Sequence, residues 1–80
     1  MNSDDISKTV QETLKEVKFA LRDKTLTNEM SFKELEVDSL DKMDLFFRLE
    51  EKFSMSFPNE EIAKMKVIGD TVNYIQNHAK

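Results

Sequence analysis

Apolar residues recur along the first part of the chain at intervals typical of a helix. The first set is spaced by four and three residues: Ile6, Val10, Leu14, Val17 and Leu21. Such spacing places these side chains on one face of a helix with a period of 3.6 residues. We therefore predict a helix over about residues 4–20, with Ser3 or Asp4 capping its start.

Residues 22–37 lose this periodicity, and we predict a long loop there. The segment is rich in polar residues of the kind found in turns and helix caps. Its apolar residues are expected to anchor the loop on the core: Leu26, Met30, Phe32 and Leu35. A loop of this length is unusual in a small domain and often has a function.

The segment from Ser39 to about Lys52 or Phe53 has two apolar stripes instead of one. The first stripe consists of Leu45, Phe46, Leu49 and Phe53. The second consists of Leu40, Met43 and Phe47, on roughly the opposite side of the helix. Acidic residues border the second stripe: Asp41, Asp44 and Glu51 on one side and Glu50 on the other. Since a surface helix needs only one buried stripe, the second is a plausible docking surface for a protein partner.

The remainder of the chain predicts two further helices. Pro58 ends the preceding pattern, and Asn59 is expected to cap a short helix over about residues 59–64. The last helix contains Ile68, Val72 and Ile75 and should end near His78, with Val67 as a poor capping residue at its start. The predicted fold is therefore all-α, and residues 1–80 are expected to form a single domain.

Composition narrows the possible functions. The net charge is −4, and residues 34–61 contain nine acidic residues against three basic ones, a local charge of −6. An acidic middle argues against nucleic-acid binding and favours basic protein partners, although an ordinary solvated helix face is the simpler explanation. The sequence has no apolar run long enough to cross a bilayer, no signal segment and no cysteine. We accordingly expect a cytoplasmic protein without a membrane span.

The sequence lacks the residues that most enzymes use. His78, near the end of the chain, is the only histidine that could activate a serine. Clusters of cysteine and histidine suited to zinc are absent, and the three-residue spacing of Asp38, Asp41 and Asp44 differs from that of a calcium-binding loop. Gly69 is a lone glycine and does not form a phosphate-binding loop. We therefore do not expect an enzyme.

Ser39 is the most interesting polar residue of the chain. It stands between Asp38 and Leu40 at the predicted start of a helix. One interpretation is that the serine only caps this helix, as serine and aspartate commonly do. The other is that it carries a phosphodiester group, which the positive end of the helix dipole would favour.

The stretch LEVDSLDKMDLFFRLEEKF resembles the acyl carrier protein family, whose signature is Leu-Gly-x-Asp-Ser-Leu. The matching residues are Leu35, Val37, Asp38, Ser39 and Leu40, whereas Glu36 stands in place of the glycine. FPNEEIAKM and IGDTVNYI are similar to later segments of the family, so that residues 31–78 match in order. Lys42 and Arg48 add positive charge to a helix that is usually acidic, and Val67 replaces a capping Ser or Thr.

The resemblance implies a four-helix bundle with a long first loop and a short third helix. It implies that Ser39, beside Asp38, receives a 4′-phosphopantetheine arm from coenzyme A through a phosphopantetheinyl transferase, and that the arm holds an acyl group as a thioester. Basic patches of acyl-transferring, chain-elongating or lipid-modifying enzymes would dock on the second helix: Leu40, Asp41, Met43, Asp44, Phe47, Glu50 and Glu51.

The pathway would be fatty-acid, lipid or specialised metabolite synthesis, with the protein acting as a monomer. A specialised member of the family fits as well as a housekeeping fatty-acid carrier. Two alternatives stay open: a carrier of aminoacyl or peptidyl groups, and an unmodified helical interaction module that keeps the fold without the arm.

Overall fold

Four α-helices and one short 3₁₀ helix form the regular structure of residues 2–78, the part of the chain that this computed structural model describes. In chain order they are α1 (Ser3–Val17), η1 (Phe19–Leu21), α2 (Ser39–Phe53), α3 (Asn59–Lys64) and α4 (Ile68–His78). The only β-type pairing among the described residues is an isolated bridge between Ser31 and Val67. The predicted all-α fold, with a long first loop and a short third helix, is confirmed.

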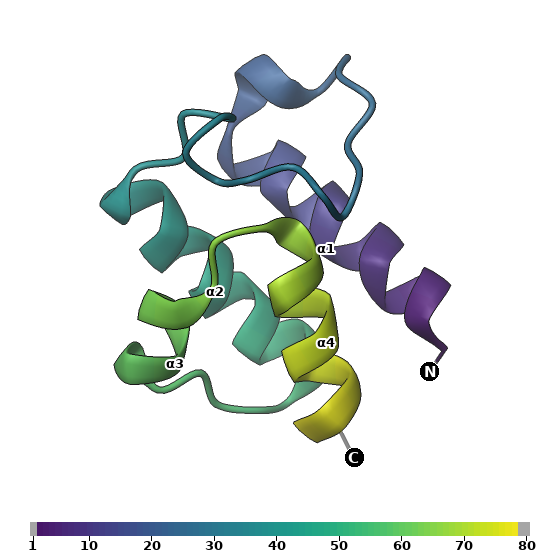
Figure 1. Cartoon of the computed structure of the whole chain (residues 1–80), viewed down its shortest axis with the longest axis vertical. Coiled ribbons are helices and arrows are strands. Elements are labelled where there is room, and N and C mark those ends of the chain that lie inside the picture. Colours follow the sequence, from purple (N-terminus) through teal and green to yellow (C-terminus); the bar gives the residue numbers. More distant parts are fainter. Residues whose placement is uncertain (1, 79–80) are drawn as a thin grey trace.

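The core lies where α1, α2 and α4 meet. Helix α1 packs against both of the others, and Figure 1 shows α4 running alongside α1 while the long loop crosses one end of the bundle. Val10, Leu14, Leu45, Leu49 and Ile75 are completely buried. No helix within residues 2–78 combines the length and the apolar character that crossing a membrane requires.

The first helix is shorter than the apolar spacing predicts. Helix α1 ends at Val17 because Lys18 adopts an extended conformation, with φ −121° and ψ 93°. The following turn, η1, brings Leu21 into the core but leaves Phe19 69% exposed. The predicted caps are also wrong, since the side chain of Asn2 accepts the hydrogen bond from the Asp5 amide at 2.9 Å.

The long loop is held by the core and by its backbone. Leu26, Phe32 and Leu35 are buried as expected, and Met30 packs partly buried against the core. The Phe32 amide donates to the carbonyl of Lys66 at 3.0 Å, and the Ile68 amide donates to the carbonyl of Met30 at 3.0 Å. The loop is thereby joined to the segment that connects α3 and α4.

The loop also approaches α4 closely at Gly69. The Gly69 amide donates to the carbonyl of Asn28 at 2.8 Å, and a Cβ atom at position 69 would lie 3.1 Å from the same oxygen. A larger residue at position 69 would therefore force the loop to shift.

The starts of α3 and α4 differ from the predicted capping. Helix α3 begins at Asn59, but Pro58 occupies the N-cap position and no side chain caps the helix. At the start of α4, the Asp70 carboxylate accepts hydrogen bonds from the amides of Lys66 (2.8 Å) and Val67 (3.1 Å). Asp70, the third residue of α4, thus holds the segment before the helix through amides that a Ser or Thr at position 67 would not reach.

Candidate functional site

The start of α2 shows which residue caps the helix. Asp38 is the N-cap, and its side chain accepts the hydrogen bond from the Asp41 amide at 2.9 Å. The Asp41 carboxylate accepts in return from the Asp38 amide at 3.4 Å, which completes a capping box. Ser39 is the first helical residue; its side chain is exposed and makes no hydrogen bond to any of the described residues. Ser39 is therefore not needed to cap the helix.

The turn before Ser39 has the backbone that a glycine would favour. Glu36 has φ 58°, in the left-handed region. Its amide donates to the carbonyl of Lys33 at 3.0 Å, and the next amide, of Val37, donates to the carbonyl of Phe32 at 2.8 Å. Val37 is consequently buried next to the exposed Asp38 and Ser39. Glu36 thus adopts the turn, although the left-handed conformation costs a non-glycine residue roughly 1–2 kcal/mol.

A shallow pocket of about 260 Å³ opens beside Ser39 between α2 and α3. Its lining residues come from both helices: Ser39, Lys42, Met43, Asn59, Ile62 and Ala63. A group attached to the Ser39 oxygen would start at the rim of this pocket. Asn59, Ile62 and Ala63 were not among the predicted site residues, because only the folded structure brings α3 next to the start of α2.

Lys42 points towards the α3–α4 connection. Its ammonium group donates to the carbonyl of Met65 at 3.3 Å and lies 5.2 Å from the centre of the Phe32 ring. The side chain is half-buried. Its ammonium group is therefore held near the end of α3 and the long loop, although the side chain also lines the pocket beside Ser39 and Met43.

The two stripes of α2 have the environments that their spacing predicts. Leu45, Phe46 and Leu49 are buried, and Phe53 packs partly buried against the core. In the second stripe, Leu40 is 76%, Met43 68% and Phe47 61% exposed. These three side chains form an apolar strip, which we call the exposed stripe. It begins next to Ser39.

Most acidic residues predicted for docking have a partner within the fold. Asp41 pairs with Lys18 at 3.4 Å in addition to its role in the capping box. Asp44 pairs with Arg48 at 2.9 Å, and this contact raises the pKa of the Arg48 guanidinium. Glu50 accepts a hydrogen bond from the Phe57 amide at 2.8 Å and so holds the end of α2 to the next loop. Glu51 is exposed and forms no ion pair within the described residues.

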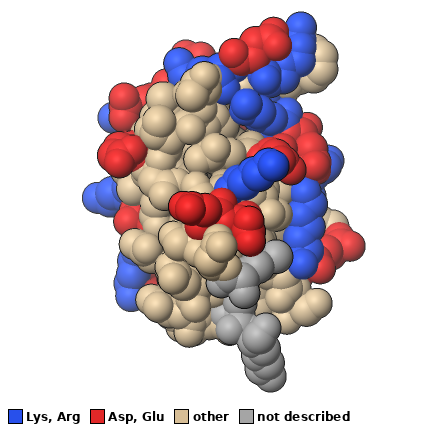
Figure 2. All heavy atoms as spheres, turned by 90° about the vertical axis from the view of Figure 1, so that its right-hand side faces the viewer, with Lys and Arg blue, Asp and Glu red and all other residues tan. Residues whose placement is uncertain are grey.

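Basic side chains of α2 extend this charge pairing to an acidic residue of α1. Glu16 on α1 accepts from both Arg48 (3.3 Å) and Lys52 (3.1 Å). The hydrogen bond from Lys52 is the main reason that the pKa of Glu16 is lowered, despite a smaller opposing effect of burial. On the face shown in Figure 2, basic and acidic side chains likewise lie among one another, so neither sign has this face to itself.

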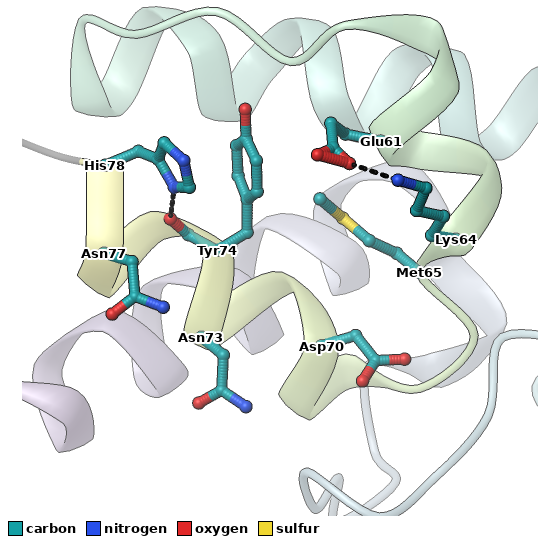
Figure 3. A pocket seen from close by; sticks show the side chains of 8 residues that line it. All are labelled: Glu61, Lys64, Met65, Asp70, Asn73, Tyr74, Asn77 and His78. Atoms are coloured by element: carbon teal, nitrogen blue, oxygen red, sulfur yellow. Dashed lines mark hydrogen bonds and ion pairs between the residues drawn. The ribbon is translucent and has the colours of Figure 1, made fainter.

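The single histidine lies in a different pocket from Ser39. This pocket, between α3 and α4, has a volume of about 260 Å³ and is drawn in Figure 3. His78 stacks on Tyr74 with 4.1 Å between ring centres, and its Nδ1 atom lies 2.9 Å from the Tyr74 carbonyl oxygen. Ser39 does not line this pocket. Within residues 2–78, no group of acidic, histidine or cysteine side chains is arranged to hold a metal ion.

Comparison with known proteins gives a consistent result. The family model described as "Phosphopantetheine attachment site" matches residues 4–75. An acyl carrier protein from Rubrobacter xylanophilus is 35% identical over 79 residues, covering 98% of this chain and 96% of the relative. One from Clostridium acetobutylicum is 45% identical over 47 residues, covering 59% of this chain and 61% of the relative.

A solved structure shares the fold. It is the crystal structure of the curacin biosynthetic pathway HMG synthase in complex with an acetyl-donor ACP. A chain in it superimposes with a TM-score of 0.80 at 26% identity, covering 91% of this chain and 94% of the other.

Proposed function

Because this chain belongs to the phosphopantetheine-attachment family of acyl carrier proteins, we propose that it carries acyl groups as thioesters on a 4′-phosphopantetheine arm attached to Ser39. Members of this family are carriers and not enzymes. The arm supplies the thiol that the cysteine-free chain lacks. The observation that carries the assignment to Ser39 is the capping box: Asp38 and Asp41 cap α2 between them, which leaves the exposed Ser39 hydroxyl available.

The surroundings of Ser39 fit the arm. A phosphodiester on the Ser39 oxygen would lie at the positive end of α2, where negative charge is favoured. Asp38 would keep the helix start in place during attachment through its hydrogen bond to the Asp41 amide. The pocket beside Ser39 offers Met43 and Ile62 as apolar contacts for the first part of the arm.

We propose the exposed stripe as the docking face for a phosphopantetheinyl transferase and for acyl-transferring enzymes. Leu40, Met43 and Phe47 would supply apolar contact next to the attachment site, since buried aromatic and aliphatic anchors dominate protein interfaces. Glu51 would attract basic patches of these enzymes directly. Asp44 would do so only in competition with Arg48.

Asp41 and Glu50 are proposed to contribute to docking mainly by fixing the two ends of α2.

Fatty-acid, lipid or specialised metabolite synthesis would all use such a carrier. We propose a monomer in the cytoplasm that works as one domain over residues 1–80. The two unexpected cations of α2 do not oppose acyl cargo: Lys42 donates one hydrogen bond to the Met65 carbonyl, and Arg48 pairs with Asp44 and Glu16.

Intact mass tests the attachment site. The apo protein is incubated with coenzyme A and a broad-specificity phosphopantetheinyl transferase, and its mass is expected to rise by one phosphopantetheinyl group. Ser39→Ala should abolish the gain, whereas Ser56→Ala, at another exposed serine, should not. An unmodified mass in the unaltered protein would contradict the proposal and favour the interaction module without an arm.

Loading kinetics test the docking face. Phe47→Ala and Glu51→Lys are expected to slow loading, and only the effect of Glu51→Lys should weaken as salt increases, because screened surface charges mainly steer association. Glu12→Lys makes the same charge change on an exposed residue of α1 and serves as the control. Equal loading rates for Phe47→Ala and the unaltered protein would reject this surface.

A further inference from the structure

A second pocket near Ser39 is basic, in contrast to the acidic character of the chain. It has a volume of about 460 Å³ and lies between the long loop, α2 and the α3–α4 connection. Its lining residues are Ser31, Phe32, Lys33, Val37, Lys42 and Lys66. Three of the six carry a positive charge and none carries a negative one.

None of the three lysine ammonium groups is paired with a carboxylate among the described residues, and Lys33 and Lys66 are exposed. The chain as a whole nevertheless has a net charge of −4. Lys42 is held in position by the Met65 carbonyl and the Phe32 ring, and it still has two N–H groups free to donate. Because three lysines and no acidic residue line this pocket, an anion bound there would be favoured.

Phe32 and Val37 form the apolar floor of this pocket, although they are buried core residues that are only 1% and 6% exposed. The methylenes of the three lysines supply further apolar lining. A pocket of this volume is in the usual range for small organic ligands and is larger than an isolated anion needs. The combination suits a ligand with an aliphatic body and one anionic end. The ligand methylenes would lie against the lysine stems above Phe32 and Val37, while the anion meets the ammonium groups.

The position of Lys42 connects this pocket with the attachment site. Lys42 lies one helical turn after Ser39 and also lines the smaller pocket at Ser39, so the two pockets are neighbours. A flexible arm attached to Ser39 would therefore reach either pocket. The phosphodiester of the arm is fixed at the Ser39 oxygen, and Ser39 does not line the basic pocket. The anion that fits is accordingly one carried at the far end of the arm.

We propose that the basic pocket formed by Lys33, Lys42 and Lys66 over Phe32 and Val37 holds the free carboxylate of a dicarboxylic acyl cargo, several methylenes long, that is bound to the arm as a half-thioester. The proposal rests on the proposed function, because it needs the arm on Ser39. It adds the chemical class of the cargo: an acyl chain with a terminal carboxylate, preferred to the uncharged chain of equal length.

A matched pair of cargoes tests this. The apo protein is loaded with adipoyl or hexanoyl phosphopantetheine from the corresponding coenzyme A thioesters, and intact mass first establishes that each group is on Ser39. Amide resonances of Phe32, Val37 and Lys66 are then compared by NMR among the adipoyl, hexanoyl and unacylated holo forms. Only the adipoyl form is expected to shift all three strongly. Failure of loading would speak against the proposed function, whereas failure of the shifts after loading would speak against the pocket alone.

Charge removal completes the test. Lys33→Gln with Lys66→Gln leaves Lys42, and its contacts with Met65 and Phe32, in place. One exposed ion pair changes an equilibrium constant by up to about fivefold, so the double variant should lose most of the adipoyl-specific shift at Val37. Lys8→Gln, on α1 outside the pocket, should retain it. Equal shifts from adipoyl and hexanoyl, the same shifts in the unacylated holo form, or an equal loss in Lys8→Gln would each overturn the proposal.

Discussion

Truncating two neighbouring phenylalanines of α2 should have opposite consequences. Phe46 is only 2% exposed, and its ring lies 5.1 Å from that of Phe57 and 6.4 Å from that of Phe32, centre to centre. Replacing a buried phenylalanine by alanine costs roughly 3–5 kcal/mol through lost burial and the cavity left behind. A domain of 80 residues has a free energy of unfolding of only about 4–12 kcal/mol. Phe46→Ala should therefore remove a large part of the stability.

Phe47 is 61% exposed, and truncation of an exposed side chain usually changes stability by about 0.5 kcal/mol or less. Since 1 kcal/mol corresponds to about 4–8 °C in a domain of this size, Phe46→Ala should lower the melting temperature by about 12 °C or more. Phe47→Ala should lower it by about 4 °C or less.

Thermal and urea denaturation followed by circular dichroism measure both variants, and the loading assay measures function. Phe47→Ala should remain folded yet load slowly, and this separation of effects is the essential result. If Phe47→Ala destabilised the protein as much as Phe46→Ala, Phe47 would belong to the core. The exposed stripe would then not be a docking face.

Two further predictions concern the backbone turn and the charge network. Glu36→Gly should raise the melting temperature, because relief of the left-handed strain at φ 58° exceeds the entropic cost of fixing a glycine by up to about 1 kcal/mol. Glu36→Ala keeps the strain and should give no gain. A lower melting temperature for Glu36→Gly would refute the presence of strain at this position. The lowered pKa of Glu16 beside Lys52 means that the ionised carboxylate stabilises the fold above its ordinary pKa and that this contribution is lost as pH falls below about 4.5. Glu16→Gln should therefore be less stable than the unaltered protein at pH 7 but not once the carboxyl is protonated, as urea denaturation across pH would show; a difference independent of pH would contradict it.

The periodicity of α2 predicted its structure well because both ends and both faces depend on local features. Asp38 and Ser39 start the helix, and the two stripes separate into a buried and an exposed side as expected. The end of α1 could not be predicted in this way. Leu21 continues the apolar spacing, but it reaches the core from η1, after the helix has been interrupted at Lys18. The apolar spacing therefore predicts correctly that Leu21 is buried, but it does not predict where α1 ends.

The charge pairs between segments could not be predicted from sequence, whereas the Asp44–Arg48 pair follows from a spacing of four residues within α2. Asp41 meets Lys18, 23 residues earlier in the chain, and Lys52 meets Glu16, 36 residues earlier. Such pairs depend on how α1 packs against α2, which local patterns do not encode. The local charge of −6 over residues 34–61 therefore overstated how acidic the surface of this segment is, because residues of other segments pair with its carboxylates. The choice between Asp38 and Ser39 as the cap also needed the structure, because both residue types are suitable.

This pairing changes how a basic partner would recognise α2. A partner that approaches Asp44 must compete with Arg48, and one that approaches Asp41 must compete with Lys18 and the capping box. Exposed ion pairs contribute only about 0–1 kcal/mol, so such exchanges can occur but yield little net affinity. The apolar surface of Leu40, Met43 and Phe47 has no such competitor. Affinity at this face should therefore come mainly from burial of the exposed stripe, with the carboxylates contributing orientation and the rate of encounter.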